Sequence, residues 1–236
     1  MNMAYLTKLL IPVILSAVLG YLCGSVSFSI LFTRWFKQDD IRNYGSGNAG
    51  ATNVLRSVGK LPAALTFVFD FIKCVISVVL GYLILQWVCR SIGVPEDLSV
   101  IGKYAGGLGC LFGHIFPLYF GFRGGKGVVT TAALIALLDV RVFIPCILTF
   151  AIIFAAKRIV SLSSVVAACC YPVYTFIIVF FFDYAKSPLS VHGAERMGTV
   201  MAQTLAAVLI AVIVLITHRA NLKRLLRGEE KPLTLH

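Results

Sequence analysis

The chain has 236 residues, of which 59% are apolar and only 13% are charged, and its mean hydropathy is +0.91. Ordinary soluble domains are about 45–50% apolar and about 25% charged, so this composition excludes a water-soluble globular protein and predicts an all-α integral membrane protein. The formal charge of +11 comes from 21 Lys and Arg against 10 Asp and Glu, a balance typical of cytoplasmic loops, of proteins that bind anionic lipid, and of proteins with phosphorylated substrates.

The apolar stretches predict about seven membrane spans, since one span needs about 20 apolar residues. The first run is longer than the apolar core of a signal peptide, which is the alternative for it. The glycine-rich third stretch permits either close helix packing or a re-entrant path. Residues 128–156 are too many for one span and carry Asp139, Arg141 and Pro145, which predicts two short helices and a tight turn. The predicted spans are 4–33, 61–89, 99–117, 127–138, 142–157, 164–182 and 199–217.

The distribution of positive charge predicts the orientation. With these spans, 14 Lys and Arg residues lie on one side, 6 lie on the other, and Lys73 lies within a span. The positive-inside rule then predicts an external N-terminus, a cytoplasmic C-terminus and motif loops on the cytoplasmic face. We expect residues 1–236 to form one polytopic membrane domain.

The first predicted cytoplasmic loop, residues 39–56, is dense in Gly, Ser, Asn and Thr and has an arginine near each end. Glycines at close spacing allow successive backbone N–H groups to converge on an anion, and the polar side chains add donors. A glycine-rich turn that is polar because it is exposed is the alternative. The candidate phosphate-binding residues are Ser46, Gly47, Asn48, Gly50, Thr52, Asn53 and Arg56.

A second loop, residues 113–127, places two basic residues around a glycine pair at the start of the following helix. Free N–H groups and the helix dipole favour an anion at such a position. A Walker A loop is excluded, because position 120 is Phe and Gly127 follows the lysine. A basic anchor at the membrane interface is the alternative. The candidates here are His114, Arg123, Gly124, Gly125 and Lys126.

Three smaller polar groups are also candidates. Ser161 belongs to a hydroxyl cluster before the sixth span, where N-capping is the alternative. We expect the last helix to continue through residue 225 into the cytoplasm, where His218, Asn221 and Arg224 form one polar stripe, with a basic end attracted to anionic lipid as the alternative. Asp70 and Lys73 lie one turn apart inside the second span, where they can neutralise each other, and we favour a structural or supporting role for them.

Several motifs are missing from the sequence, which narrows the reaction. No His is followed by Asp four or five residues on, as in thioester-dependent glycerolipid acyltransferases, and GxSxG is absent. There is no acidic cluster for Mg²⁺, and the seven cysteines include no CxxC and no zinc spacing. We therefore expect no metal, no cofactor and no covalent intermediate.

The motifs together resemble one known family. They are Gly24-Ser25, the run from Arg42 to Arg56, Asp70-x-x-Lys73, Gly113-His114 through Gly-Gly-Lys-Gly, Ser161-Leu162, and His218-x-x-Asn221-x-x-Arg224-Leu225. From about residue 20 to 226 the chain resembles the bacterial acyl-phosphate:glycerol-3-phosphate acyltransferases, the PlsY family. Cys74 stands where the family usually has Gly, and the stretch 183–197 is longer than in small members.

The resemblance implies transfer of a fatty acyl group from acyl phosphate to the sn-1 hydroxyl of glycerol 3-phosphate, the first acylation of phospholipid biosynthesis, in the bacterial cytoplasmic (inner) membrane. By analogy, Lys126, Ser161, His218 and Asn221 are catalytic, and the residues of the two loops bind substrate phosphates. His218, His114 or an oxygen of a substrate phosphate accepts the hydroxyl proton.

The expected partners are the two substrates and the lipid bilayer, without nucleic acid. We expect a monomer, and association with the enzyme that forms acyl phosphate is compatible with this interpretation. The competing class is a membrane transporter of an organophosphate anion, which predicts cationic groups near the bilayer midplane and internal repeats. The sequence shows no repeat and places its motifs on one face.

Overall fold

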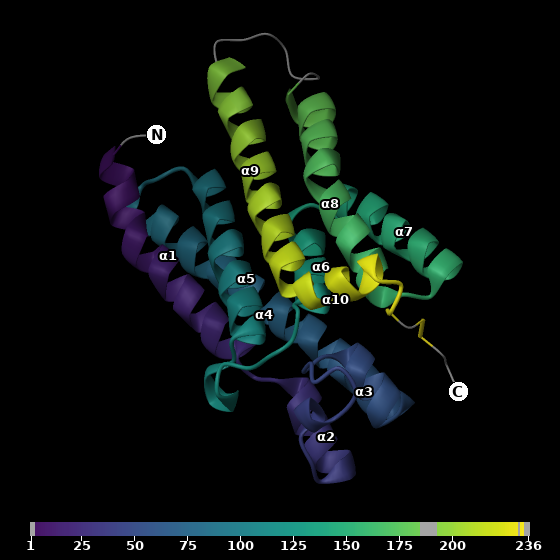
Figure 1. Ribbon diagram of the computed structural model, residues 1–236. Helices are drawn as coiled ribbons and strands as arrows, with labels where there is room; N and C mark the ends of the chain where they lie inside the picture. Colours follow the sequence, from purple (N-terminus) through teal and green to yellow (C-terminus); the bar gives the residue numbers. More distant parts are fainter. Residues whose placement is uncertain (1–2, 185–192, 231, 234–236) are drawn as a thin grey trace. The chain divides into compact units, whose positions relative to one another are not determined.

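The computed structural model describes residues 3–184, 193–230 and 232–233 (Figure 1). The described chain is helical and divides into two compact units, Met1–Leu138 and Asp139–His236. A single membrane domain over 1–236 stays a prediction.

The first unit is a bundle whose central helix is α5. This helix packs against α1 and α4, and α6 packs against α4 and α5. The helices α2 and α3 lie together at one end of the unit, near the loop that follows α5 (Figure 1). The α-helices of this unit are α1 Met3–Gly24, α2 Phe28–Lys37, α3 Ala51–Ser57, α4 Lys60–Ile92, α5 Val100–Ile115 and α6 Val128–Leu138.

Glycines allow α5 to approach its neighbours at backbone distance. A Cβ atom at Gly106 would collide with the backbone carbonyl of Ser77 in α4, and one at Gly113 would collide with the carbonyl of Tyr21 in α1. Small residues at such crossings let helices pack closely in a membrane. α5 is one continuous helix, as the close-packing alternative predicts.

The span predicted at 4–33 corresponds to one apolar segment long enough to cross a membrane, Thr7–Lys37, but this segment is not one continuous helix. α1 ends at Gly24, and the amphipathic helix α2 begins at Phe28. The backbone carbonyl of Val26, between the two helices, is bonded to α4: Lys73 Nζ donates to it at 2.8 Å. α2 buries Ile30 completely and leaves Trp35 76% exposed, a pattern typical of a helix at a membrane interface.

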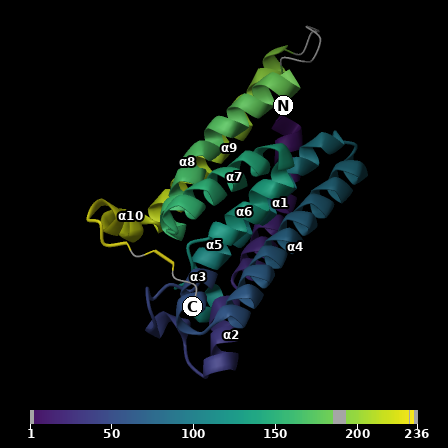
Figure 2. The ribbon, with the colours of Figure 1, turned by 90° about the vertical axis from the view of Figure 1, so that its right-hand side faces the viewer.

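The second unit contains three long helices and one short one. α8 packs against α7 and α9, and α10 contacts both α8 and α9 (Figure 2). The helices are α7 Val140–Lys157, α8 Val160–Ile178, its π-helical continuation Val179–Tyr184, α9 Gly193–Thr217 and α10 Arg219–Leu226. The predicted division of the long apolar stretch is confirmed: α6 ends at Leu138, and Asp139 caps α7 by accepting the backbone N–H of Arg141 at 2.8 Å.

The expectation that the last helix continues through residue 225 is wrong. α9 ends at Thr217 and a separate helix begins at Arg219. At the break, the backbone N–H of His218 lies 3.1 Å from the carbonyls of both Val214 and Leu215. His218 lies between the two helices as the N-cap of α10, and its side chain is buried, with only 2% exposed.

Five segments of the described chain are long and apolar enough to cross a membrane. They carry large apolar side chains on their outer surfaces, for example Ile11, Trp87 and Ile152, each more than 60% exposed, which suits contact with lipid tails. The first segment is counted across the break at 25–27, and α5 and α6 are shorter than the other segments. The five segments are Thr7–Lys37, Lys60–Ile92, Val140–Lys157, Val160–Tyr184 and Met197–Thr217.

Candidate active site

Asn53 organises the first loop from inside. It is 3% exposed, and its Nδ2 donates to the backbone carbonyls of Tyr44 at 2.9 Å, Asn48 at 3.1 Å and Ile41 at 3.2 Å. Its Oδ1 accepts the backbone N–H of Ser46 at 3.2 Å. Both ends of the amide thus hold the loop together, so we expect Asn53 to shape the loop and not to contact a substrate phosphate.

The other candidates of this loop are more accessible. The backbone at Gly47 has φ +68°, a left-handed conformation that favours glycine, and it turns the chain so that Ser46 is exposed. Gly50 is the N-cap of α3, and Thr52 and Asn48 are half-buried. Arg56, in the last turn of α3, is exposed. The N–H groups of Gly47 and Gly50 are bonded to the carbonyls of Tyr44 at 2.9 Å and Asn48 at 3.1 Å, so these glycines do not offer free donors as predicted. Anion binding by the side chains of Ser46, Asn48, Thr52 and Arg56 stays a prediction.

The second loop folds back along the end of α5. The backbone N–H of Gly124 donates to the carbonyl of Ile115, and that of Gly125 to the carbonyl of His114, both at 3.1 Å. The expectation that these two N–H groups bind phosphate is therefore wrong, since both are bonded within the unit. A Cβ at Gly125 would collide with His114 Nε2 and the carbonyl of Ala49, so the first loop, the second loop and α5 meet at this glycine.

A buried ionic cluster lies beneath the second loop. Lys73 Nζ is 2.7 Å from Asp70 Oδ1 and 3.1 Å from His114 Nδ1, and each of the three side chains is less than 10% exposed. Because an ammonium group only donates, His114 Nδ1 must accept and Nε2 must carry the ring proton. This arrangement places His114 under the glycine pair as a support, and it does not favour His114 as the base.

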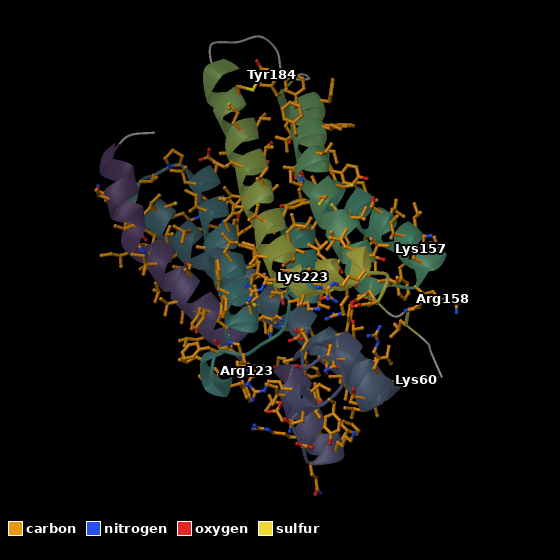
Figure 3. All side chains as sticks on the ribbon, viewed as in Figure 1. Lys60, Arg123, Lys157, Arg158, Tyr184 and Lys223 are labelled. Atoms are coloured by element: carbon orange, nitrogen blue, oxygen red, sulfur yellow. The ribbon has the colours of Figure 1, made fainter. Side chains whose placement is uncertain are left out.

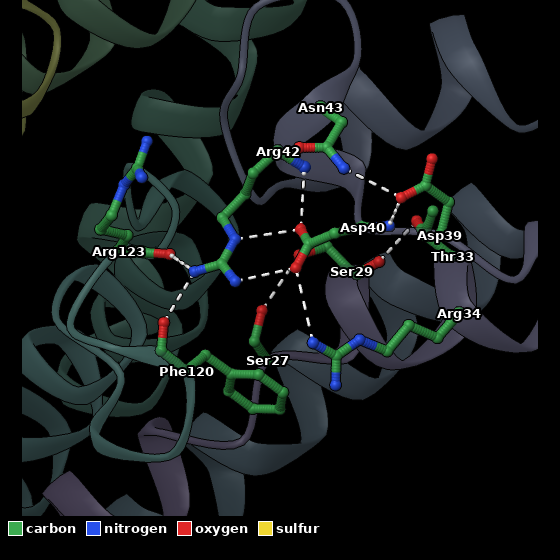
Figure 4. A network of polar contacts seen from close by, with 10 residues as sticks. All are labelled: Ser27, Ser29, Thr33, Arg34, Asp39, Asp40, Arg42, Asn43, Phe120 and Arg123. Carbon is green, nitrogen blue, oxygen red and sulfur yellow. Dashed lines mark hydrogen bonds and ion pairs between the residues drawn. The ribbon is translucent and has the colours of Figure 1, made fainter.

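Asp40 and Arg42 form a second polar network, shown in Figure 4. Asp40 accepts hydrogen bonds from Arg42 Nε at 3.0 Å and Nη2 at 2.8 Å, and Arg34 Nη2 lies 3.6 Å away. Burial opposes ionisation of Asp40, but the hydrogen bonds from Arg42 outweigh it and hold the pKa of the carboxyl below its usual value. Arg42 Nη1 continues the network to the carbonyls of Phe120 and Arg123 in the second loop.

In the second unit, three candidate residues meet on one carboxylate that the sequence did not single out. Glu230 Oε1 accepts from Ser161 Oγ at 2.7 Å and Asn221 Nδ2 at 2.5 Å, and Oε2 accepts from Arg224 Nε at 2.6 Å. Partial burial opposes ionisation of Glu230, but these donors lower its pKa. Glu229 and Glu230 are the only acidic residues after Glu195, which is the one signal that the sequence carried.

His218 belongs to the same unit. Its Nδ1 lies 2.8 Å from the carbonyl of Val214, which can only accept. Nδ1 therefore carries the proton in the neutral ring, and Nε2 is the basic nitrogen. This tautomer suits a general base.

Basic residues gather at one end of each unit (Figure 3). In the second unit, Lys157, Arg158 and Lys223 lie at the end where α8 begins, and Tyr184 lies at the other end. In the first unit, Arg123 and Lys60 lie at the end that carries α2 and α3. Arg123 is exposed and Lys126 is half-buried.

Comparison with known proteins gives consistent matches. A family model described as glycerol-3-phosphate acyltransferase matches residues 14–228. The chain is 34% identical to a glycerol-3-phosphate acyltransferase of Clostridioides difficile, over 92% of this chain and 94% of the relative. It is 36% identical to one of Parasynechococcus marenigrum, over 94% and 92%. A crystal structure of PlsY, an integral membrane glycerol 3-phosphate acyltransferase, in its glycerol 3-phosphate form is similar with a TM-score of 0.69 and 30% identity, covering 94% of this chain and 96% of that chain.

Proposed function

Because the chain belongs to the glycerol-3-phosphate acyltransferase family, we propose that it transfers a fatty acyl group from acyl phosphate to the sn-1 hydroxyl of glycerol 3-phosphate. The products are lysophosphatidic acid and inorganic phosphate. The observation that carries the proposal is the similarity, over 94% of the chain, to PlsY in its glycerol 3-phosphate form. The polar and basic groups of both units suit two substrates that each carry a phosphate.

The reaction needs no nucleophile from the protein. The sn-1 oxygen attacks the acyl carbon, the bond from that carbon to the phosphate oxygen breaks, and phosphate leaves with the electron pair. The hydroxyl proton passes to His218 Nε2 or to an oxygen of a substrate phosphate. Negative charge grows on the carbonyl oxygen and the leaving phosphate, where Lys126 and Arg123 stabilise it.

The remaining residues bind and orient the substrates. In our proposal Ser46, Asn48, Thr52 and Arg56 hold one substrate phosphate. Ser161 and Asn221 act in catalysis with their side chains oriented by Glu230, which contacts both. Asp70 and Lys73 support His114 beneath the second loop, and Arg224 supports Glu230.

The protein is an integral, multi-pass membrane protein, and we propose the bacterial cytoplasmic membrane as its location. α5 and α6 join the five long segments to give seven spans, with the N-terminus outside and the C-terminus in the cytoplasm. We propose that it acts as a monomer within the bilayer.

Cysteine labelling tests this topology. In a variant without the seven native cysteines, single cysteines at Ser46 and Arg123, both exposed, should react with a membrane-impermeant reagent only from the cytoplasmic side. A cysteine at the exposed Asp97, in the connection before α5, should react only from outside. Labelling of positions 46 and 123 from opposite sides would contradict an active site on one face of the membrane.

Donor choice tests the reaction itself. Purified protein in detergent should form lysophosphatidic acid from palmitoyl phosphate and glycerol 3-phosphate, and should be inactive with palmitoyl-CoA. The physical reason is that the site offers cations to a phosphate leaving group, and the sequence lacks the His-Asp pair of thioester-dependent enzymes. Mass spectrometry of the extracted lipid measures the product. Equal turnover with palmitoyl-CoA would show the proposed donor to be wrong.

A further inference from the structure

We propose that Arg42, clamped by Asp40, is a positioning residue that holds the turn at residues 120–123 and thereby places Lys126. The kinetic part of this inference rests on the proposed function, and its structural part does not.

The clamp fixes the orientation of the guanidinium group. Asp40 Oδ1 accepts from both the backbone N–H and Nε of Arg42, each at 3.0 Å, and Asp40 Oδ2 accepts from Nη2 at 2.8 Å. A planar guanidinium held by a carboxylate in this two-pronged way has one orientation, in contrast to a lysine ammonium. The side chains of Asp40 and Arg42 are 20% exposed or less, so water competes weakly for these bonds.

The third nitrogen of the Arg42 guanidinium group, Nη1, binds the second loop. Arg42 Nη1 donates to the carbonyl of Phe120 at 2.7 Å and to the carbonyl of Arg123 at 3.3 Å, 78 and 81 residues away along the chain (Figure 4). One cation thus holds both ends of a four-residue turn. Gly124 and Gly125, which follow, are bonded to the end of α5, and Lys126 comes next.

The turn needs such support because its backbone is strained. Gly121 has φ +69° and Phe122 has φ +58°, and the left-handed region is unfavourable for a bulky side chain such as Phe. Phe122 is exposed, so burial of its side chain does little to offset the cost of this backbone conformation. Strained residues persist where surrounding contacts hold them, and the two carbonyls that Arg42 binds lie on either side of Phe122 in the chain.

Hydrogen–deuterium exchange tests the structural part. In Arg42→Ala, backbone amides from 120 to 126 should exchange faster than in the unchanged protein, while those in the middle of α4 and α5 should not change. Arg34→Gln is the matched control, because Arg34 also contacts Asp40 and lies 5.7 Å from the ring of Phe120 but is 55% exposed. If Arg42→Ala leaves exchange at 120–126 unchanged, the inference is wrong, whether or not the protein is an acyltransferase.

Steady-state kinetics tests the consequence. Arg42→Ala should lower kcat by about 100-fold, since a displacement of about 1 Å outside the reacting groups can have this effect. The KM for glycerol 3-phosphate should change by less than about threefold, because Lys126 stabilises the transition state more than the bound substrate. Added guanidinium ion should restore part of kcat in Arg42→Ala and should not affect Arg42→Lys. Arg34→Gln should stay within about twofold, as expected for an exposed ion pair.

A second variant keeps the inference testable if Arg42→Ala does not fold. Asp40→Asn removes the negative charge that orients the fork and leaves Arg42 in place, so it should show the same changes in exchange and kcat to a smaller extent. An unaltered kcat in Asp40→Asn, or a rise in KM alone, would overturn the inference. Inactivity of the unchanged protein would refute the proposed function, and the exchange result would still decide the role of Arg42.

Discussion

Lys126→Ala should lower kcat for acyl transfer by about 100-fold or more, as loss of one preorganised donor to transition-state charge typically does. As the hydroxyl attacks, negative charge moves to the carbonyl oxygen and the departing phosphate, in a membrane setting where screening is weak. Lys126 is half-buried and follows the glycine pair that is bonded to the end of α5. A cation held there stabilises the transition state more than the bound substrate.

The measurement is steady-state kinetics of folded variants in detergent, with Lys60→Ala as the control. Lys60 is an exposed lysine at the start of α4 in the same unit, so its removal also takes away one positive charge. Lys60→Ala should keep kcat within about twofold, since exposed charges contribute little. A near-normal kcat in Lys126→Ala would show that Lys126 does not stabilise the transition state, and would favour the alternative of a basic anchor at the membrane interface.

Asp70→Ala should lower the free energy of unfolding by about 3–5 kcal/mol, the usual cost of removing one partner of a buried ion pair. The substitution leaves the ammonium of Lys73 buried at 3% exposure without the carboxylate that lies 2.7 Å from it. Lys73 Nζ also lies 3.1 Å from Nδ1 of His114, whose ring lies beneath Gly125, so a displaced ammonium would disturb this support.

Denaturant unfolding in detergent measures this loss. The double variant Asp70→Leu with Lys73→Met is the control, because it removes both charges and keeps the side-chain volume similar. It should regain much of the stability, since an apolar pair of similar size often replaces a buried ion pair without loss. If Asp70→Ala is as stable as the unchanged protein, the cluster does not hold α4 and α5 together.

The sequence predicted the features that depend on local residues. The break between α6 and α7 follows from a polar cap, Asp139, inside an apolar run too long for one span. The glycines of α5 predicted close packing because a residue without a Cβ is the local requirement for it. The loops were located from their composition, which is also a local property.

The features that were missed depend on contacts that form only when the chain folds. The first apolar run is interrupted between Gly24 and Phe28, where the carbonyl of Val26 accepts from Lys73, a partner 47 residues away. Asn53 is buried inside its loop, although its position in a motif suggested contact with an anion. Glu230 was missed because the chain must turn back after α10 to bring this carboxylate to Asn221 and Arg224, and because Ser161 lies 69 residues away.

Direct transfer between two substrates is the central claim, and rapid-quench measurement of phosphate release tests it most directly. Purified protein mixed with palmitoyl phosphate and glycerol 3-phosphate should release inorganic phosphate and form 1-palmitoyl lysophosphatidic acid in equal amounts. Without glycerol 3-phosphate there should be no rapid phase of phosphate release, because no protein group takes the acyl chain. A burst of phosphate equal to the amount of enzyme, or phosphate release without lysophosphatidic acid when both substrates are present, would contradict this account.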